Sequence, residues 1–188
     1  MDTKMSRFKI HDEESAPAGS LPLLKAAVST AGQLPNFLGV IAASPAVLRG
    51  YARFRNELRQ GVLPPATVER ISLAVASLHR SEPGLTLHAR TARSKGITLD
   101  EVARARRWTS SESKEAALLA WLKATATNTA TAPRHLHEAA VEAGWTDGEL
   151  LEAIAVMTLE TFTALVNVAG EVPVDGSTEE TRQLRAVA

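Results

Sequence analysis

The chain has 188 residues, of which 45% are apolar and only 4% are aromatic. This length is enough for one domain with a sizeable core, and the low aromatic content is typical of closely packed helices. The 21 basic and 21 acidic side chains give zero formal net charge, so the composition lacks the basic footprint of a nucleic-acid-binding protein. No cysteine is present, which excludes disulfides, thiolate nucleophiles and cysteine-ligated metal centres.

The first 20 residues lack an apolar core of signal-peptide length. No run of residues reaches the ~18 apolar positions that a membrane span needs. We therefore expect a soluble, cytoplasmic protein with neither a membrane nor a nucleic acid as its partner.

Helical patterns fill the chain between two polar arms, residues 1–20 and 171–188, and define one domain over residues 21–170. Prolines at helix starts and glycines after helix ends set many of the boundaries. The expected helices span residues 21–31, 35–44, 46–60, 66–79, 83–95, 99–108, 113–126, 132–143 and 147–169. No alternating run of β-branched residues competes with them, so the predicted fold class is all-α.

A short internal repeat links GITLDEV (96–102) to GWTDGEL (144–150). In each copy a glycine takes the left-handed conformation that ends one helix, and a threonine caps the next. Glu101 or Glu149 then closes a capping box, so neither glutamate is assigned to catalysis. The repeat predicts two similar helix–loop–helix units in a bundle with some internal symmetry.

The last helix, residues 147–169, is apolar around most of its circumference. Such a helix lies at the centre of the core or is buried against another subunit. We therefore expect a homo-oligomer.

The stretch ERISLAVASLHRSEPGLTLH (69–88) contains the residues best suited to chemistry. Glu69 shares a mainly apolar helix face with Leu73 and Ala76, and burial raises a carboxyl pKa towards the range useful for proton transfer. A turn at SEPG could bring His88, on the following helix, towards Glu69. The alternative is structural: an acid near a helix N-terminus is favoured by the helix dipole, and a lone histidine is usually a satisfied core residue.

Metal binding is not expected from the other histidines. His135 and His137 are two positions apart and do not face each other on a helix.

The chain resembles the carboxymuconolactone decarboxylase / alkylhydroperoxidase D-like superfamily over roughly residues 33–175. The matching segments are LPNFLGVIAASPAVLRGYARFRNELRQGVLPPATVERISLAVA, LTLHARTARSKGITLDEV, AALLAWLKA, AGWTDGELLEAIAVMTLETFTALVN and VAGEVPVD. The resemblance implies an alkylhydroperoxidase D-like helical bundle, assembled as a trimer or hexamer with its site near a subunit interface. It also implies no organic cofactor and usually no metal.

The peroxidase branch of that superfamily has Glu, eleven residues, Cys, two residues, Cys, three residues and His. Here Glu69 and His88 match the outer positions, while Ser81 and Gly84 occupy the cysteine positions. Peroxide reduction by that branch needs two sulfurs that end as a disulfide. The substitutions therefore exclude a thiol peroxidase.

The decarboxylase branch resembles the segment SEPGLTLHARTA, with matches at Glu82, Leu85, Leu87, His88 and Arg90. The late aromatic segment of that branch is absent. The segment TFTALVN resembles instead a Thr-x-Thr-Asn-x-x-Asn motif of the cysteine-bearing group. It departs from that motif at Ala164, keeps Asn167, and has Val168 where a histidine is common.

Three hypotheses follow for a small organic substrate. The first is a cofactor-free lyase, decarboxylase or isomerase in which Glu69 and His88 move protons. In it Ser81 contributes a hydrogen bond, and the pocket is lined by Gly84, His79, Trp121 and Asn167.

The second hypothesis is a non-catalytic scaffold that binds a ligand or a partner. The third is a hydrolase with Ser81 as nucleophile, His88 as base and Glu69 as the residue that orients it. No nucleophile elbow or oxyanion hole supports the third hypothesis. An open cavity lined by Glu69 and His88, with a bound small molecule, favours an enzyme, and a collapsed, solvent-free region favours the scaffold.

Overall fold

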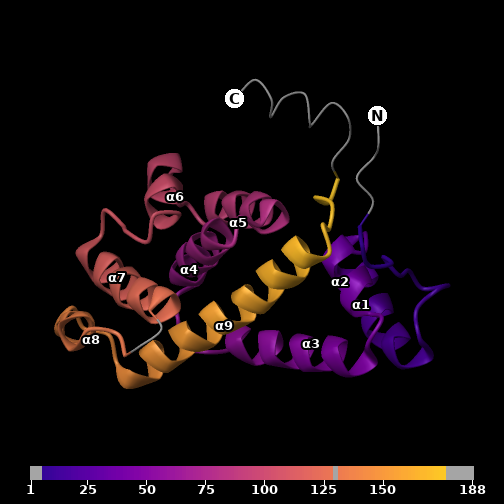
Figure 1. The fold of residues 1–188 in the computed structure, drawn as a ribbon, viewed down its shortest axis with the longest axis horizontal. Helices are drawn as coiled ribbons and strands as arrows, with labels where there is room; N and C mark the ends of the chain where they lie inside the picture. Colours follow the sequence, from indigo (N-terminus) through magenta and orange to yellow (C-terminus); the bar gives the residue numbers. More distant parts are fainter. Residues whose placement is uncertain (1–5, 129–130, 177–188) are drawn as a thin grey trace. The chain divides into compact units, whose positions relative to one another are not determined.

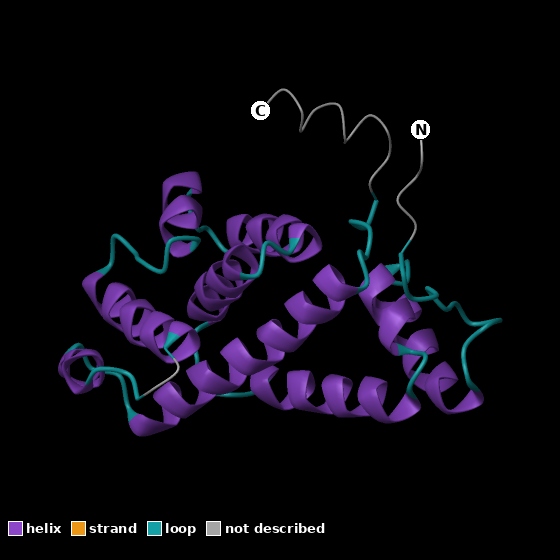
Figure 2. Cartoon of the chain, in the orientation of Figure 1, coloured by secondary structure: helices purple, strands orange, loops and turns teal. Residues whose placement is uncertain are grey.

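A computed structural model describes residues 6–128 and 131–176 of the chain. These residues form helices and loops without any strand, which confirms the all-α prediction (Figures 1 and 2). The elements are η1 (Ala18–Ser20), α1 (Leu21–Ala31), α2 (Asn36–Ile41), α3 (Pro45–Arg59), α4 (Pro65–Leu78), α5 (Glu82–Ser94), α6 (Leu99–Ala105), α7 (Ser113–Thr127), α8 (Arg134–Glu142) and α9 (Asp147–Ala169).

The chain divides into two compact units, and each is described by itself. Unit 1 comprises residues 1–54 and 165–188, and unit 2 comprises residues 55–164. The boundaries between the units fall inside α3 and α9.

In unit 1 the described parts of both predicted arms are hydrogen-bonded to the rest of the unit. The amide of Arg7 donates to the carbonyl of Gly170 at 2.7 Å, and the amide of Asn36 donates to Asp175 Oδ1 at 2.7 Å. These segments are therefore part of the fold of unit 1. Residues 1–5 and 177–188, the outer parts of the predicted arms, lie outside the described residues.

Unit 2 is built on α4, which packs against α5 and α6, while α7 packs against α8 (Figure 1). Its main core contains fully buried leucines from α7, together with Trp121, Trp145 and Ile71. Most of α4 is buried because it lies between neighbouring helices, so the few polar side chains on it must find partners inside the protein.

Both glycines of the predicted repeat have left-handed backbones, with φ of 82° at Gly96 and 92° at Gly144. A side chain at these positions is strained, which explains why glycine ends the preceding helix at each. The second copy forms the predicted capping box: the amide of Thr146 donates to Glu149 Oε2 at 2.8 Å, and the amide of Glu149 donates to Thr146 Oγ1 at 3.3 Å.

The first copy forms only half of the predicted box. The amide of Glu101 donates to Thr98 Oγ1 at 3.2 Å, as expected for the cap of α6. The carboxylate of Glu101 does not return to Thr98; it accepts a hydrogen bond from Arg70 Nε at 2.9 Å. A buried guanidinium is a stronger partner for this carboxylate than an exposed backbone amide.

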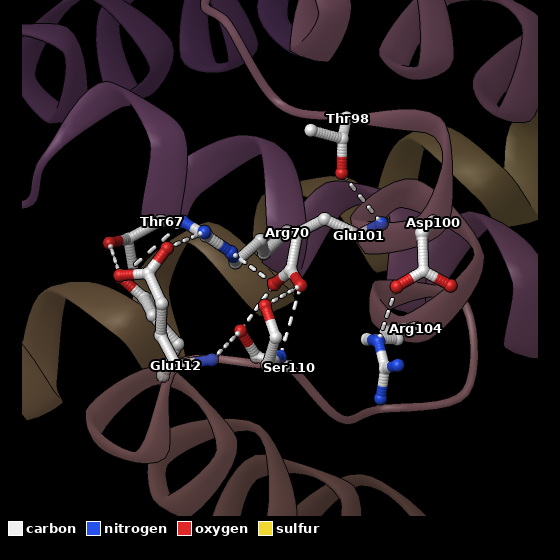
Figure 3. Close-up of polar contacts among 10 residues, drawn as sticks. Thr67, Arg70, Thr98, Asp100, Glu101, Arg104, Ser110 and Glu112 are labelled. Carbon is white, nitrogen blue, oxygen red and sulfur yellow. Dashed lines mark hydrogen bonds and ion pairs between the residues drawn. The ribbon is translucent and has the colours of Figure 1, made fainter.

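Arg70 is the centre of a buried ionic network that joins α4, α6 and α7 (Figure 3). Its guanidinium pairs with Glu101, Glu112 and Glu115, and Thr67 donates to Glu115 Oε1 at 2.6 Å. Two serines, Ser110 and Ser111, donate the remaining hydrogen bonds to Glu101. Burial opposes ionisation, but these bonds outweigh it and lower the pKa of Glu101 to about 2.

α9 has the length and composition of a membrane span: it has 23 residues, and an 18-residue window within it has a mean hydropathy of 1.4. The sequence expectation concerned an uninterrupted apolar run, and α9 meets the mean-hydropathy criterion although Glu152 and Glu160 interrupt its apolar residues. A core helix of a soluble protein meets the same criterion. Ala153, Val156 and Met157 of α9 do belong to the core of unit 2.

Candidate active site

Unit 2 contains a cavity of about 440 Å³. Its apolar wall is formed by Leu58, Leu63, Val68, Val156 and Leu159. Among its polar lining residues are Glu69 and His88. A cavity of this size, mostly apolar with a few convergent polar groups, is typical of sites for small molecules.

Glu69 and His88 meet in this cavity from adjacent helices. Glu69 lies on α4 and is 5% exposed, and His88 lies on α5 and is 8% exposed. The Nδ1 atom of His88 is 3.0 Å from Glu69 Oε2. The turn between α4 and α5 thus brings the two side chains within hydrogen-bond distance.

Two further charged residues complete the group. The Nε2 atom of His88 lies 3.1 Å from Oε2 of Glu160, which belongs to α9. Lys95 follows the last turn of α5, and its Nζ donates to Glu69 Oε1 at 2.7 Å. One imidazole therefore lies between two carboxylates, and a lysine holds the second oxygen of Glu69.

This arrangement favours the imidazolium form of His88. A neutral imidazole has one N–H and one lone pair, so one of its two carboxylate neighbours would face a lone pair. Burial disfavours the charged ring, but attraction by Glu160 and hydrogen bonds to Glu160 and Glu69 outweigh it and raise the pKa of His88 to about 9. Burial likewise opposes the carboxylate of Glu69, but His88 and Lys95 lower its pKa below the ordinary value.

Local sequence explains why α5 begins where it does. Ser81 is the N-cap of α5, and its hydroxyl accepts a hydrogen bond from the amide of Gly84 at 3.4 Å. Pro83 lies in the first turn, where its missing N–H costs nothing. A Cβ at Gly84 would lie 3.1 Å from the Cβ of Ala76, so glycine allows α5 to approach α4 closely.

Five of the seven residues proposed for the site from the sequence do not line this cavity. Ser81, 1% exposed, caps α5, and Gly84 packs on α4. His79 follows α4 as its C-cap. Trp121 belongs to the main core of unit 2, where its ring makes an edge contact with His137. Asn167 is buried in unit 1.

The sequence interpretation missed Glu160 and Lys95. Glu160 is the one charged residue between Glu152 and Glu171, and a lone charge in an apolar helix is a signal of a buried partner. Lys95 lies seven positions after His88, which places both on one helix face. Both signals were present in the sequence, but neither identifies the partner.

Metal ligands do not gather in the part of the chain that the structure describes. Across residues 6–128 and 131–176, no group of three or more histidine, aspartate or glutamate side chains is arranged to hold a metal ion.

Comparisons with known proteins place the fold. Residues 45–127 match the model of the carboxymuconolactone decarboxylase family. A peroxidase-related protein from Ralstonia eutropha JMP134 with an alkylhydroperoxidase AhpD core is similar, with a TM-score of 0.80 and 14% identity over 93% of this chain and 95% of that one. A search of curated proteins found no match.

Two other solved structures share the fold. A peroxidase-related protein from Silicibacter sp. TM1040 has a TM-score of 0.75 and 16% identity, over 93% of this chain and 94% of that one. The debrominase Bmp8, solved in complex with 2,3,4-tribromopyrrole, has a TM-score of 0.73 and 16% identity, over 98% of both chains.

Proposed function

We propose that the chain is a member of the carboxymuconolactone decarboxylase / alkylhydroperoxidase D-like superfamily without the redox cysteine pair, and that it is a cofactor-free acid–base enzyme. It is not a thiol peroxidase, because a chain without cysteine cannot carry a dithiol–disulfide cycle. The reaction is a lyase, decarboxylase or isomerase step on a small organic substrate. The observation that carries the proposal is His88, held between two carboxylates at the wall of a cavity of about 440 Å³.

In this proposal His88 is the general acid. With its pKa raised to about 9, it carries a proton at neutral pH that it can give to a developing oxyanion or carbanion. Glu160 and Glu69 line the same cavity and are the candidate bases. Lys95 positions Glu69 by holding Oε1, which leaves Oε2 towards His88.

The fold and the cavity both support a small organic ligand. Bmp8, which has a similar fold, was solved with a small heterocycle bound, although 16% identity carries no substrate across to this chain. The cavity at Glu69 and His88 is open, so the collapsed region that would favour a non-catalytic scaffold is not found there.

The second candidate is a ligand-binding scaffold without catalysis. Loss of both cysteine positions, together with Ala164 and Val168 in the late motif, favours it. The hydrolase hypothesis has no such support, because Ser81 is buried as a helix cap and does not line the cavity. A trimer or hexamer and a cytoplasmic location stay predictions.

A panel of small carbon acids tests the proposal. The panel contains lactones, β-keto acids and enolisable ketones, and the purified protein is tested in D₂O. We expect that at least one member gains deuterium, undergoes ring opening or loses its carboxylate. These substrates are activated enough for catalysis of about 10²–10⁴-fold per acid–base group. Proton NMR follows the reactions. Binding of panel members without any turnover would favour the scaffold instead.

A further inference from the structure

Two arginines, Arg55 and Arg59, line the cavity without a partner for their charge. Within the described part of the chain, neither guanidinium forms an ion pair or hydrogen bond. The other charged groups of the cavity pair among themselves: Glu160 with His88, and Glu69 with His88 and Lys95. With His88 protonated, those four charges balance, and the arginines supply the excess positive charge of the cavity.

The two arginines are placed to act together. They are four positions apart at the end of α3, so they share one helix face, and Leu58 on the same turn also lines the cavity. Cations at a helix C-terminus are favourable with the helix dipole, which explains a basic residue there. The dipole does not explain why both side chains line a cavity and lack a carboxylate partner.

We propose that Arg55 and Arg59 bind the carboxylate of a small organic acid, which is the substrate class of the site; this rests on the proposed function. Guanidinium groups bind carboxylates through paired, charge-assisted hydrogen bonds. The apolar body of the acid then lies against the aliphatic wall, with its reacting end at His88. The two carboxylates of the cavity are already paired with His88 and Lys95, so the two arginines are the cavity cations left to bind an anion.

Three probes of similar size test this recognition: 3-phenylpropionate, its uncharged analogue 3-phenylpropanamide, and phenyl phosphate. By calorimetric titration at pH 7 and low salt, we expect the carboxylate to bind about tenfold more tightly than the amide. Arg55→Gln and Arg59→Gln should each weaken carboxylate binding about fivefold and leave amide binding unchanged. The matched control is Arg53→Gln, because Arg53 is an arginine of α3 that is exposed, as Arg55 and Arg59 are, but does not line the cavity.

Several outcomes would overturn carboxylate recognition. They are equal affinity for carboxylate and amide, no detectable carboxylate binding at about 10 mM, an equal loss in Arg53→Gln, or tighter binding of phenyl phosphate. The titration involves no turnover, so its result is independent of catalysis. If the proposed function is wrong but carboxylate recognition is right, the protein converts no member of the carbon-acid panel. The titration still shows tighter binding of the carboxylate than of the amide, and the loss in the two arginine variants.

Discussion

Replacing His88 by alanine is expected to lower turnover by about 10²–10⁴-fold, the usual contribution of one general acid. The variant removes the imidazole that contacts both cavity carboxylates, at 3.0 Å from Glu69 and 3.1 Å from Glu160. Glu69→Gln should cause a loss in the same range, because the amide keeps the shape of the side chain but cannot take a proton. Initial rates on a substrate found with the carbon-acid panel measure both effects.

His79→Ala is the matched control for this prediction. His79 is nine positions before His88 and follows α4 as its C-cap, but it does not line the cavity. Its replacement should therefore leave the rate unchanged. Full activity in both His88→Ala and Glu69→Gln would contradict the acid–base mechanism. An equal loss of turnover in His79→Ala would indicate a general effect on the fold.

Replacing Arg70 by methionine is expected to destabilise the protein by about 3–5 kcal/mol, the usual cost of removing one partner of a buried ion pair. Arg70 is 5% exposed and is the cation shared by Glu101, Glu112 and Glu115. Without it, Glu101 and Glu115 are left as buried carboxylates without a cation. Burial already raises the pKa of Glu115, despite the hydrogen bond from Thr67 and the charge of Arg70. Urea denaturation measures the loss.

Two further variants test whether the loss of stability comes from the buried ion pairs of Arg70 and not from the removal of any arginine. Arg104→Met removes the exposed pair with Asp100, 2.8 Å apart at positions i and i+4, and should leave the urea midpoint unchanged. Adding Glu115→Gln to Arg70→Met should recover part of the lost stability, since it removes one unpaired charge. An Arg70→Met protein as stable as the parent would show that the network does not stabilise the fold.

The helix boundaries were largely predictable because their signals are local. Gly32 and Gly96 follow α1 and α5 in the predicted way, and prolines mark the starts of α3 and α4. The contact between Glu69 and His88 could also be predicted from the sequence, since the two residues lie on consecutive helices joined by a short turn.

The rest of the site depends on contacts that no local pattern contains. Glu160 is 72 positions after His88, so its approach is decided by how α9 packs and not by the sequence around it. Ser81 was proposed for the site because it stands at a cysteine position of the resembling family, and the structure places its hydroxyl at the cap of α5. Trp121 was proposed as a pocket residue, and the structure places this large apolar side chain in the main core of unit 2.

The protonation state of His88 is the central claim, and an NMR pH titration of its ring tests it most directly. The His88→Ala spectrum assigns its signal among the five histidines of the chain. We predict that His88 titrates with a pKa of about 9 in the parent. We also predict that the pKa falls in Glu160→Gln, because burial remains while the attraction of Glu160 is lost. A His88 that titrates at or below its ordinary value of 6.5 in the parent, or that is unchanged in Glu160→Gln, would contradict the account.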